Sequence, residues 1–207
     1  FTVSGLRGSD TVASLSSVVA SGATGKNAGS YTNTVTAGTE TNYTVSTVNG
    51  GLTIAKANAT VTANSGTLTY NGGNQTVSGF TASGLVGGET ASVLSGVSAS
   101  RTEKNAGTYA TTASGTDGNY NLSFVDGSML INKAALTATG NSTSVTYNGA
   151  NQTVSGFTVS GLQGSDTVAS LSSVVASGAT GKNAGSYTNT VTAGTETNYT
   201  VSTVNGG

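Results

Sequence analysis

The sequence predicts an all-β fold built from small tandem domains, and three observations lead to this prediction. Residues 1–51 recur as residues 157–207 with one difference, Arg7 against Gln163, so the offset is 157 − 1 = 156 residues. A diverged copy lies between them, because Lys104–Tyr109 matches Lys26–Tyr31 at an offset of 104 − 26 = 78. Thr, Val, Ser and Gly dominate with an alternation of period two, which favours strands over helices.

The repeat length sets the expected domain organisation. A unit of about 77–79 residues is longer than a solenoid repeat, so it indicates tandem domains. We expect a partial repeat at 1–56 that lacks its first strands, a complete repeat at 57–133, and a near-complete repeat at 134–207 that lacks its last strand. A piece of a longer array is the favoured interpretation, although bound strands from other chains could complete either end.

Each repeat is expected to be a small antiparallel β-sandwich. In the complete repeat we predict strands near 59–63, 66–70, 75–82, 90–94, 97–103, 108–114, 119–125 and 128–132. Asp126-Gly127 is predicted to form a two-residue hairpin turn, and Asn49-Gly50 and Asn205-Gly206 are its counterparts. The stretch after Asp10 is assigned first to a strand, with a helical turn capped by Asp10 as the alternative.

The connection between repeats contains no flexible linker. Leu52 and Ile54 precede Lys56, and an alternating strand pattern follows within two residues. The segment that begins at Ser128 has the same form. Because flexible linkers are rich in Gly and Ser, these joints should resist bending, and we predict an elongated, stiff rod of domains.

The Gly-x-Tyr motif predicts the main structural side chains. It resembles the tyrosine that closes a corner in immunoglobulin-like (Ig-like) sandwiches. Tyr31, Tyr109 and Tyr187 occupy this position in the three repeats, and we expect their rings to be buried. Leu52 and Ile54 are expected to belong to the same structural set.

Composition excludes several classes of function. Charged residues make up 7% of the chain and the net charge is −1, so nothing favours binding to nucleic acid or to an anionic membrane. The chain has no Cys, so it has no disulfide, and it has no apolar run of the length of a membrane span. Any attachment to a membrane would depend on segments outside these residues.

Catalysis and cofactor binding have little support. The absence of His and Cys removes the commonest general base and the most reactive nucleophile. Asp10, Glu89 and Asp166 occupy matching places, which favours a turn or cap role. The carboxylates are too scattered for a calcium loop, so we predict no enzyme activity, no cofactor and no metal site.

Three weaker possibilities remain open at this point. Lys26 and its counterparts Lys104 and Lys182 could form Lys–Asn isopeptide bonds, although a turn before the tyrosine strand is the simpler interpretation. The seven N-x-S/T sequons are about as many as chance gives in a chain so rich in Ser, Thr and Asn. Surface Thr could bind carbohydrate or ice, but its spacing is irregular.

The motifs together resemble a known family. A Tyr-Asn-Gly turn at Tyr70, a Gly-Glu-Thr-Ala segment at Gly88, the Gly-x-Tyr strand at Gly107 and the Asn-Tyr strand at Asn119 follow one another in order. This pattern is similar to the MBG/YDG-type repeats of large bacterial surface proteins, including filamentous-haemagglutinin-like adhesins. The resemblance implies export, cell-surface display and a role in adhesion or matrix, with no catalytic residues.

The leading functional hypothesis is therefore structural. We expect a stalk region of a bacterial cell-surface adhesin or extracellular fibre, located outside the cell, in which each repeat contacts its neighbours. The alternative is an adhesive module that associates end to end with itself, or that binds a glycan or matrix protein through the avidity of its repeats.

Overall fold

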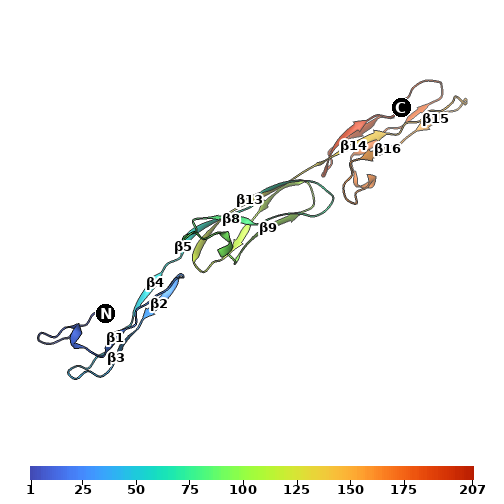
Figure 1. Cartoon of the computed structure of the whole chain (residues 1–207). Helices are drawn as coiled ribbons and strands as arrows, with labels where there is room; N and C mark the ends of the chain where they lie inside the picture. The colour runs from blue at the N-terminus through green and yellow to red at the C-terminus, as the bar shows by residue number, and fades with distance from the viewer. The chain divides into compact units, whose positions relative to one another are not determined.

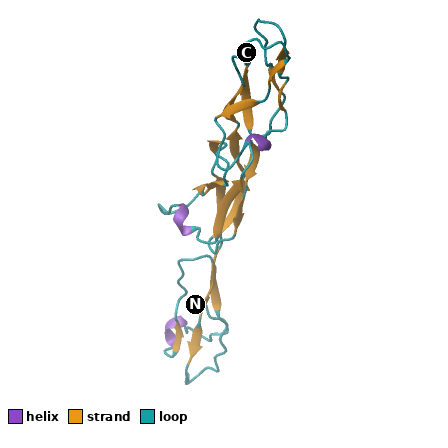
Figure 2. Ribbon diagram, turned by 90° about the vertical axis from the view of Figure 1, so that its right-hand side faces the viewer, coloured by secondary structure: helices purple, strands orange, loops and turns teal.

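The fold is all-β, as the sequence predicts. The computed structural model describes all 207 residues. Figure 2 shows strands joined by loops, together with three short helical turns. The strands form eight small sheets, four with two strands and four with three. The expected all-β class and its tandem repeat units are therefore confirmed.

The elements are grouped here by the repeats predicted from the sequence, and Figure 1 colours the chain by residue number. Repeat 1 (1–56) contains η1 (Val12–Ser14), β1 (Val18–Ala20), β2 (Gly29–Asn33), β3 (Val35–Ala37) and β4 (Gly50–Ile54). Repeat 2 (57–133) contains β5 (Ala57–Ala63), β6 (Gly66–Thr69), β7 (Gln75–Ser78), β8 (Phe80–Ser83), η2 (Ala91–Val93), β9 (Val97–Glu103), β10 (Gly107–Thr111), β11 (Ala113–Gly115), β12 (Tyr120–Val125) and β13 (Gly127–Asn132). Repeat 3 (134–207) contains β14 (Ala134–Gly140), β15 (Gln152–Val154), β16 (Phe157–Ser160), η3 (Val168–Ser170), β17 (Val174–Ala176), β18 (Ala179–Gly181), β19 (Val191–Ala193) and β20 (Tyr199–Val204).

The strand predicted at 90–94 is wrong, because this segment forms the 3₁₀ turn η2. The strand predicted after Asp10 is wrong in its first part, which forms η1, but Val18–Ala20 is strand β1. Each turn buries one apolar side chain at its end, Leu94 at 1% exposed and Leu15 at 6%, while the valine of the turn stays outside. The alternative of a helical turn is therefore correct, but Thr11 rather than Asp10 is the N-cap residue.

The predicted hairpin at Asp126-Gly127 is also wrong. β12 belongs to the sheet β12–β5–β8, whereas β13 belongs to the sheet β10–β13–β6. Gly127 does not have the positive φ that a tight hairpin turn requires. A Cβ there would lie 2.5 Å from the carbonyl oxygens of Ala63 and Asn64, so the glycine is needed for close packing of backbones as the chain crosses between sheets.

The hairpin turns predicted at the counterparts Asn49-Gly50 and Asn205-Gly206 are wrong for the same reason. Neither glycine has a positive φ. The Asn49 side chain accepts a hydrogen bond from the Val35 amide, and Gly50 pairs with Asn33. Asn205 accepts the same bond from the Val191 amide, and Gly206 pairs with Asn189. The asparagine therefore supports the start of β3 and β19 rather than a hairpin.

Two strand pairs are parallel, which the expectation of antiparallel sheets did not include. β13 pairs antiparallel with β10 and parallel with β6. β14 pairs antiparallel with β16 and parallel with β20. At the second joint, the last strand of repeat 2 and the first strand of repeat 3 therefore each lie in the middle of a three-stranded sheet.

The chain forms two compact units, and each contains one joint between repeats. Unit 1 comprises 1–61, 82–97 and 115–123, and unit 2 comprises 62–81, 98–114 and 124–207. One core cluster of unit 2 takes buried residues from both sides of its joint: Tyr70, Met129, Ile131, Ala134, Leu136 and Tyr199. Repeats 2 and 3 therefore share a core instead of being independent globules.

Candidate functional site at the joints between repeats

Each joint passes from strand to strand with almost no linker. β4 ends at Ile54 and β5 begins at Ala57, while β13 ends at Asn132 and β14 begins at Ala134. The predicted direct passage between strands is therefore present at both joints. The last strand of one repeat therefore leads directly into the first strand of the next.

An asparagine clamps the first joint, within unit 1. Asn119 of repeat 2 accepts a hydrogen bond at Oδ1 from the Ala28 amide of repeat 1 (2.9 Å) and donates from Nδ2 to Asn27 Oδ1 (3.2 Å). Its own carbonyl accepts from the Ala57 amide at the start of β5 (2.9 Å). One residue therefore holds both the Lys-Asn-Ala-Gly loop of repeat 1 and the bridging strand.

The second joint, within unit 2, has the same clamp, in which Asn198 takes the place of Asn119. Asn198 of repeat 3 accepts from the Ala106 amide (2.9 Å), donates to Asn105 Oδ1 (3.2 Å), and accepts at its carbonyl from the Ala134 amide (2.9 Å). The agreement between two joints of different surrounding sequence shows that the clamp is a property of the repeat.

A lysine completes each joint. Lys56 Nζ donates to the Asp117 carbonyl and Lys133 Nζ donates to the Glu196 carbonyl, both at 2.6 Å. Glu196 is buried at 5% exposed, and its carboxylate accepts hydrogen bonds from the amide and the hydroxyl of Ser173. Each ammonium group therefore binds a backbone oxygen across its joint.

The Gly-x-Tyr tyrosines lie beside the clamps but are less buried than expected. Their hydroxyls donate to the carbonyl four residues earlier, in the pairs Tyr31–Asn27, Tyr109–Asn105 and Tyr187–Asn183. This bond closes the loop that the clamp asparagine binds, as the resemblance to a tyrosine corner suggested. The rings themselves are half-buried in the first two repeats, and Tyr187 is 40% exposed, so the expected full burial is wrong.

Leu52 and Ile54 are also more exposed than residues in a core position would be. Leu52 is 37% exposed and Ile54 is half-buried, while their counterparts Met129 and Ile131 are at 0% and 1%. The physical reason is that β4 pairs only with β2, whereas β13 is covered by strands on both edges. The same strand position is therefore a core position only where both neighbours are present.

Sequence reasoning missed the tyrosine that follows the clamp asparagines Asn119 and Asn198 and their counterpart Asn42. The hydroxyl of this tyrosine donates to an acid and accepts from a backbone amide in every repeat. The acid pairs are Tyr43–Asp10 (2.5 Å), Tyr120–Glu89 (2.5 Å) and Tyr199–Asp166 (2.6 Å), and the amides are those of Arg7, Val86 and Gln163. The sequence offered one signal for this pair, because the tyrosine and the acid both recur at matching positions of the three repeats. Each acid closes a turn through its backbone amide, as predicted, and its side chain binds a tyrosine.

In unit 2 the Tyr199–Asp166 pair has a third member from the other side of the joint. Tyr70 of repeat 2 donates to the same Asp166 Oδ2 at 2.8 Å, and its ring meets the Tyr199 ring edge-on with centroids 5.5 Å apart. Tyr70 is 2% exposed and Tyr199 is 4% exposed. One carboxylate of repeat 3 therefore satisfies two buried phenols, one from each repeat.

This arrangement shifts the pKa values of its members. Burial, together with the bond to Asp166, raises the pKa of Tyr199 to about 12. The hydrogen bond from Tyr199 holds the pKa of Asp166 below its ordinary value, and the bond from Tyr70 acts in the same direction. Burial and the same carboxylate raise the pKa of Tyr70. The joint is therefore built for a charged carboxylate and neutral phenols.

We expect unit 2 to lose stability in alkali. The phenol of Tyr199 ionises near pH 10 in the unfolded chain but only near pH 12 in the folded chain. The stability that this difference contributes is therefore intact below pH about 10, and it falls by about 2 kcal/mol as the pH rises to about 12. Urea unfolding across this range, read with tyrosinate absorbance, measures the loss. Tyr199→Phe should be less stable at neutral pH and should show a shallower decline. A decline equally steep in the variant would contradict the assignment.

The site contains no constellation for chemistry. No group of three or more residues of the metal-ligating types lies together, and no helix is long and apolar enough to cross a membrane. The side chains at the joints bind backbone and one another. Strands that pass from repeat to repeat without a linker and a repeated polar clamp define the chain as a tandem-repeat β protein.

Comparison with protein families identifies these repeats. The MBG domain (YGX type) matches residues 1–53, 59–130 and 136–207, so the chain belongs to the MBG family. MBG domains occur in bacterial surface proteins, where tandem copies form repeat regions, and they are generally non-catalytic; no enzyme family matches. Comparison with curated proteins and with solved structures gives no match.

Proposed function

We propose that this chain is part of the stalk of a bacterial cell-surface adhesin or extracellular fibre, where it acts as a stiff array of domains. The observation that carries the proposal is the joint, because the same asparagine clamp and the same lysine bond recur at both joints. Domains joined by a flexible linker move independently by default. Strands that pass directly from one repeat to the next, together with hydrogen bonds between the two repeats, restrain such motion.

The absence of reactive groups also supports a mechanical role. The repeats have little charge, no His and no Cys. A surface rich in hydroxyls and poor in charge attracts few partners through long-range electrostatics. These properties suit a spacer that holds another part of the protein at a distance from the cell.

The proposal predicts that Asn198→Ala loosens the second joint. The variant loses both side-chain bonds to repeat 2, which should cost about 1–3 kcal/mol of unit 2 stability. Because the chain has no Cys, spin labels can be placed on Thr108→Cys and Thr192→Cys, two exposed positions of unit 2 on either side of the joint. We expect a narrow distance distribution between the labels that broadens in Asn198→Ala.

Asn42→Ala is the matched control for this experiment. Asn42 is the counterpart of Asn198 in repeat 1, within the duplicated segment, and its side chain is exposed. The control should leave the distribution between Thr108→Cys and Thr192→Cys narrow. A broad distribution in the otherwise unchanged chain, or no broadening in Asn198→Ala, would refute a stiff stalk.

A further inference from the structure

Two tyrosine rings from different repeats meet in the core of unit 2. Tyr70 of repeat 2 and Tyr199 of repeat 3 have ring centroids 5.5 Å apart and an interplanar angle of 82°. The two residues belong to one buried cluster, at 2% and 4% exposed. Because they are far apart in the sequence, a covalent bond between the rings would fasten one repeat to the next.

The carboxylate between the rings brings their reactive positions together. Both hydroxyls donate to Asp166 Oδ2, Tyr70 at 2.8 Å and Tyr199 at 2.6 Å. The ring carbons next to a hydroxyl carry much of the unpaired electron density of a tyrosyl radical. Since one oxygen atom lies within hydrogen-bond distance of both phenols, these carbons lie at the end where the two rings converge. Coupled phenol rings are twisted about their new bond, so nearly perpendicular rings are a suitable starting point.

The same carboxylate can accept the proton that a phenol loses on oxidation. The hydrogen bond from Tyr199, together with that from Tyr70, holds the pKa of Asp166 below its ordinary value, so this group is charged at neutral pH. Oxidation without loss of the proton would leave a positive charge in an apolar site, which is costly. A charged acceptor that is already bonded to the hydroxyl removes this cost by taking the proton.

Tyr109 gives an oxidant a route into the core. Its ring is half-buried and packs against the cluster that contains Tyr70. An oxidant that does not reach Tyr70 can therefore take an electron from Tyr109, which the buried phenol then replaces across the cluster. Tyr109→Phe should slow the oxidation of Tyr70 without changing the ring to which it couples.

We propose that Tyr70 and Tyr199 form an oxidative cross-linking site, at which a one-electron oxidant joins the two rings as dityrosine. Each phenol gives one electron to the oxidant and its hydroxyl proton to Asp166 or, through it, to water. The two radicals form a carbon–carbon bond between the positions next to their hydroxyls. Each of these carbons then releases its hydrogen as a proton while the hydroxyl regains one. The net change is two electrons to two equivalents of oxidant and two protons to water.

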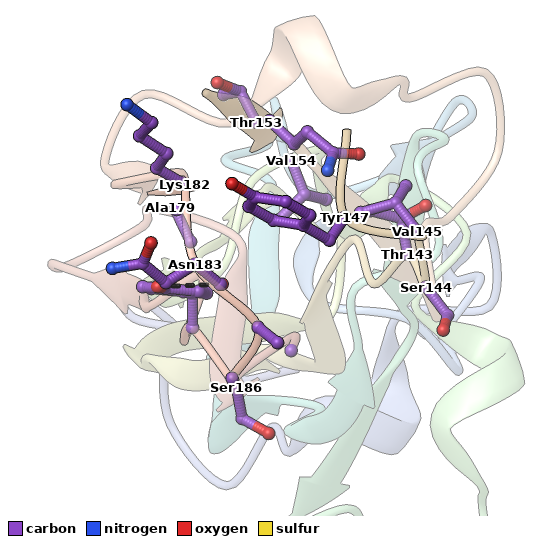
Figure 3. Close-up of a pocket in the computed structure, with 16 residues that line it drawn as sticks. Thr143, Ser144, Val145, Tyr147, Thr153, Val154, Ala179, Lys182, Asn183 and Ser186 are labelled. Carbon is purple, nitrogen blue, oxygen red and sulfur yellow. Dashed lines mark hydrogen bonds between the residues drawn. The ribbon is translucent and has the colours of Figure 1, made fainter. Parts of the chain in front are cut away.

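Tyr147 shows what exposure alone would favour. It is the counterpart of Tyr70 in repeat 3 and is 61% exposed. Figure 3 shows it beside a cavity of about 470 Å³, near Val145. An oxidant that reacted only with accessible rings would couple Tyr147 and leave Tyr70 unchanged. The position of the cross-link therefore distinguishes the two cases, and the proposal does not depend on the stalk role.

The test is photo-oxidation of the dilute full chain with ruthenium tris-bipyridyl and persulfate, followed by trypsin digestion and mass spectrometry. The tryptic peptides 57–101 and 134–182 contain one tyrosine each, Tyr70 and Tyr147. We expect a monomeric product in which peptide 57–101 is joined to peptide 183–207 with the loss of two hydrogen atoms, and which has dityrosine fluorescence. The linked chain should unfold at a higher urea concentration, because a cross-link restricts the unfolded chain, as a disulfide does.

Variants of the chain locate the bond. Tyr199→Phe should abolish the linked peptide, whereas Tyr187→Phe, which changes the other tyrosine of peptide 183–207, should retain it. Asp166→Asn keeps an acceptor oxygen but loses the base, and it should lower the yield at least about tenfold. The proposal is overturned if the unaltered chain gives no such link, if peptide 134–182 takes the place of peptide 57–101, or if the link survives in Tyr199→Phe.

Discussion

Asp166→Ala is expected to destabilise unit 2 by about 3 kcal/mol, because it removes the charged acceptor of two buried phenols. Tyr199 and Tyr70 both donate to Asp166 Oδ2, at 2.6 and 2.8 Å. Without the carboxylate, two hydroxyls that are shielded from water lose their partner. Urea unfolding gives the change in stability. Hydrogen exchange at Ala134–Gly140 gives the local effect, because this strand occurs only once in the chain.

Two variants separate this effect from a general loss of a surface charge. Asp10→Ala removes the counterpart in repeat 1, where the carboxylate is exposed and accepts from Tyr43 alone, and should cost about 1 kcal/mol or less. Asp166→Asn keeps an acceptor oxygen and should fall between the two. If Asp166→Ala and Asp10→Ala cost the same, the bond across the joint contributes nothing and the shared site is refuted.

Ile131→Ala is expected to cost about 3 kcal/mol of stability in unit 2. Ile131 is 1% exposed and lies in the central strand β13, in the core cluster shared across the joint. The substitution leaves a cavity between β10, β6 and the first strand of repeat 3. Hydrogen exchange should rise at Gly107–Thr111 as well as at β13 itself.

The matched substitution is Ile54→Ala in repeat 1. Ile54 occupies the same strand position but is half-buried, because β4 has a partner on one edge only. We expect a cost of about 1 kcal/mol, since less apolar contact is lost. Equal costs for the two variants would mean that the strand on the second edge of β13 does not create the core.

The corrections share one physical cause. Alternation and turn residues report which local structure a segment adopts, but not which strand it will pair with. Asp126-Gly127 therefore resembled a hairpin turn, although β12 and β13 pair with strands far away in sequence. In the same way, the tyrosines of the Gly-x-Tyr motif resembled core residues. The buried phenols are instead Tyr70, Tyr120 and Tyr199, whose partners lie 31 to 96 residues away.

The two copies of residues 1–51 show most directly where local sequence stops deciding structure. Val191 is 3% exposed and Tyr199 is 4% exposed, while the identical Val35 and Tyr43 are only half-buried. β14 supplies the strand that covers the first pair, and repeat 1 has no strand in that place. Conversely, the segment 29–33 forms a strand that 185–189 does not.

The sequence by itself determined the all-β class, the tandem repeats, the direct strand passage at each joint and the MBG family, because each follows from composition, period and local order. Only the tertiary structure decided which residues form the joint. The asparagine clamps, the tyrosine–carboxylate pairs and the shared core join residues that are up to 96 positions apart. Their energies depend on burial, which a residue acquires from its neighbours in space rather than from its place in the chain.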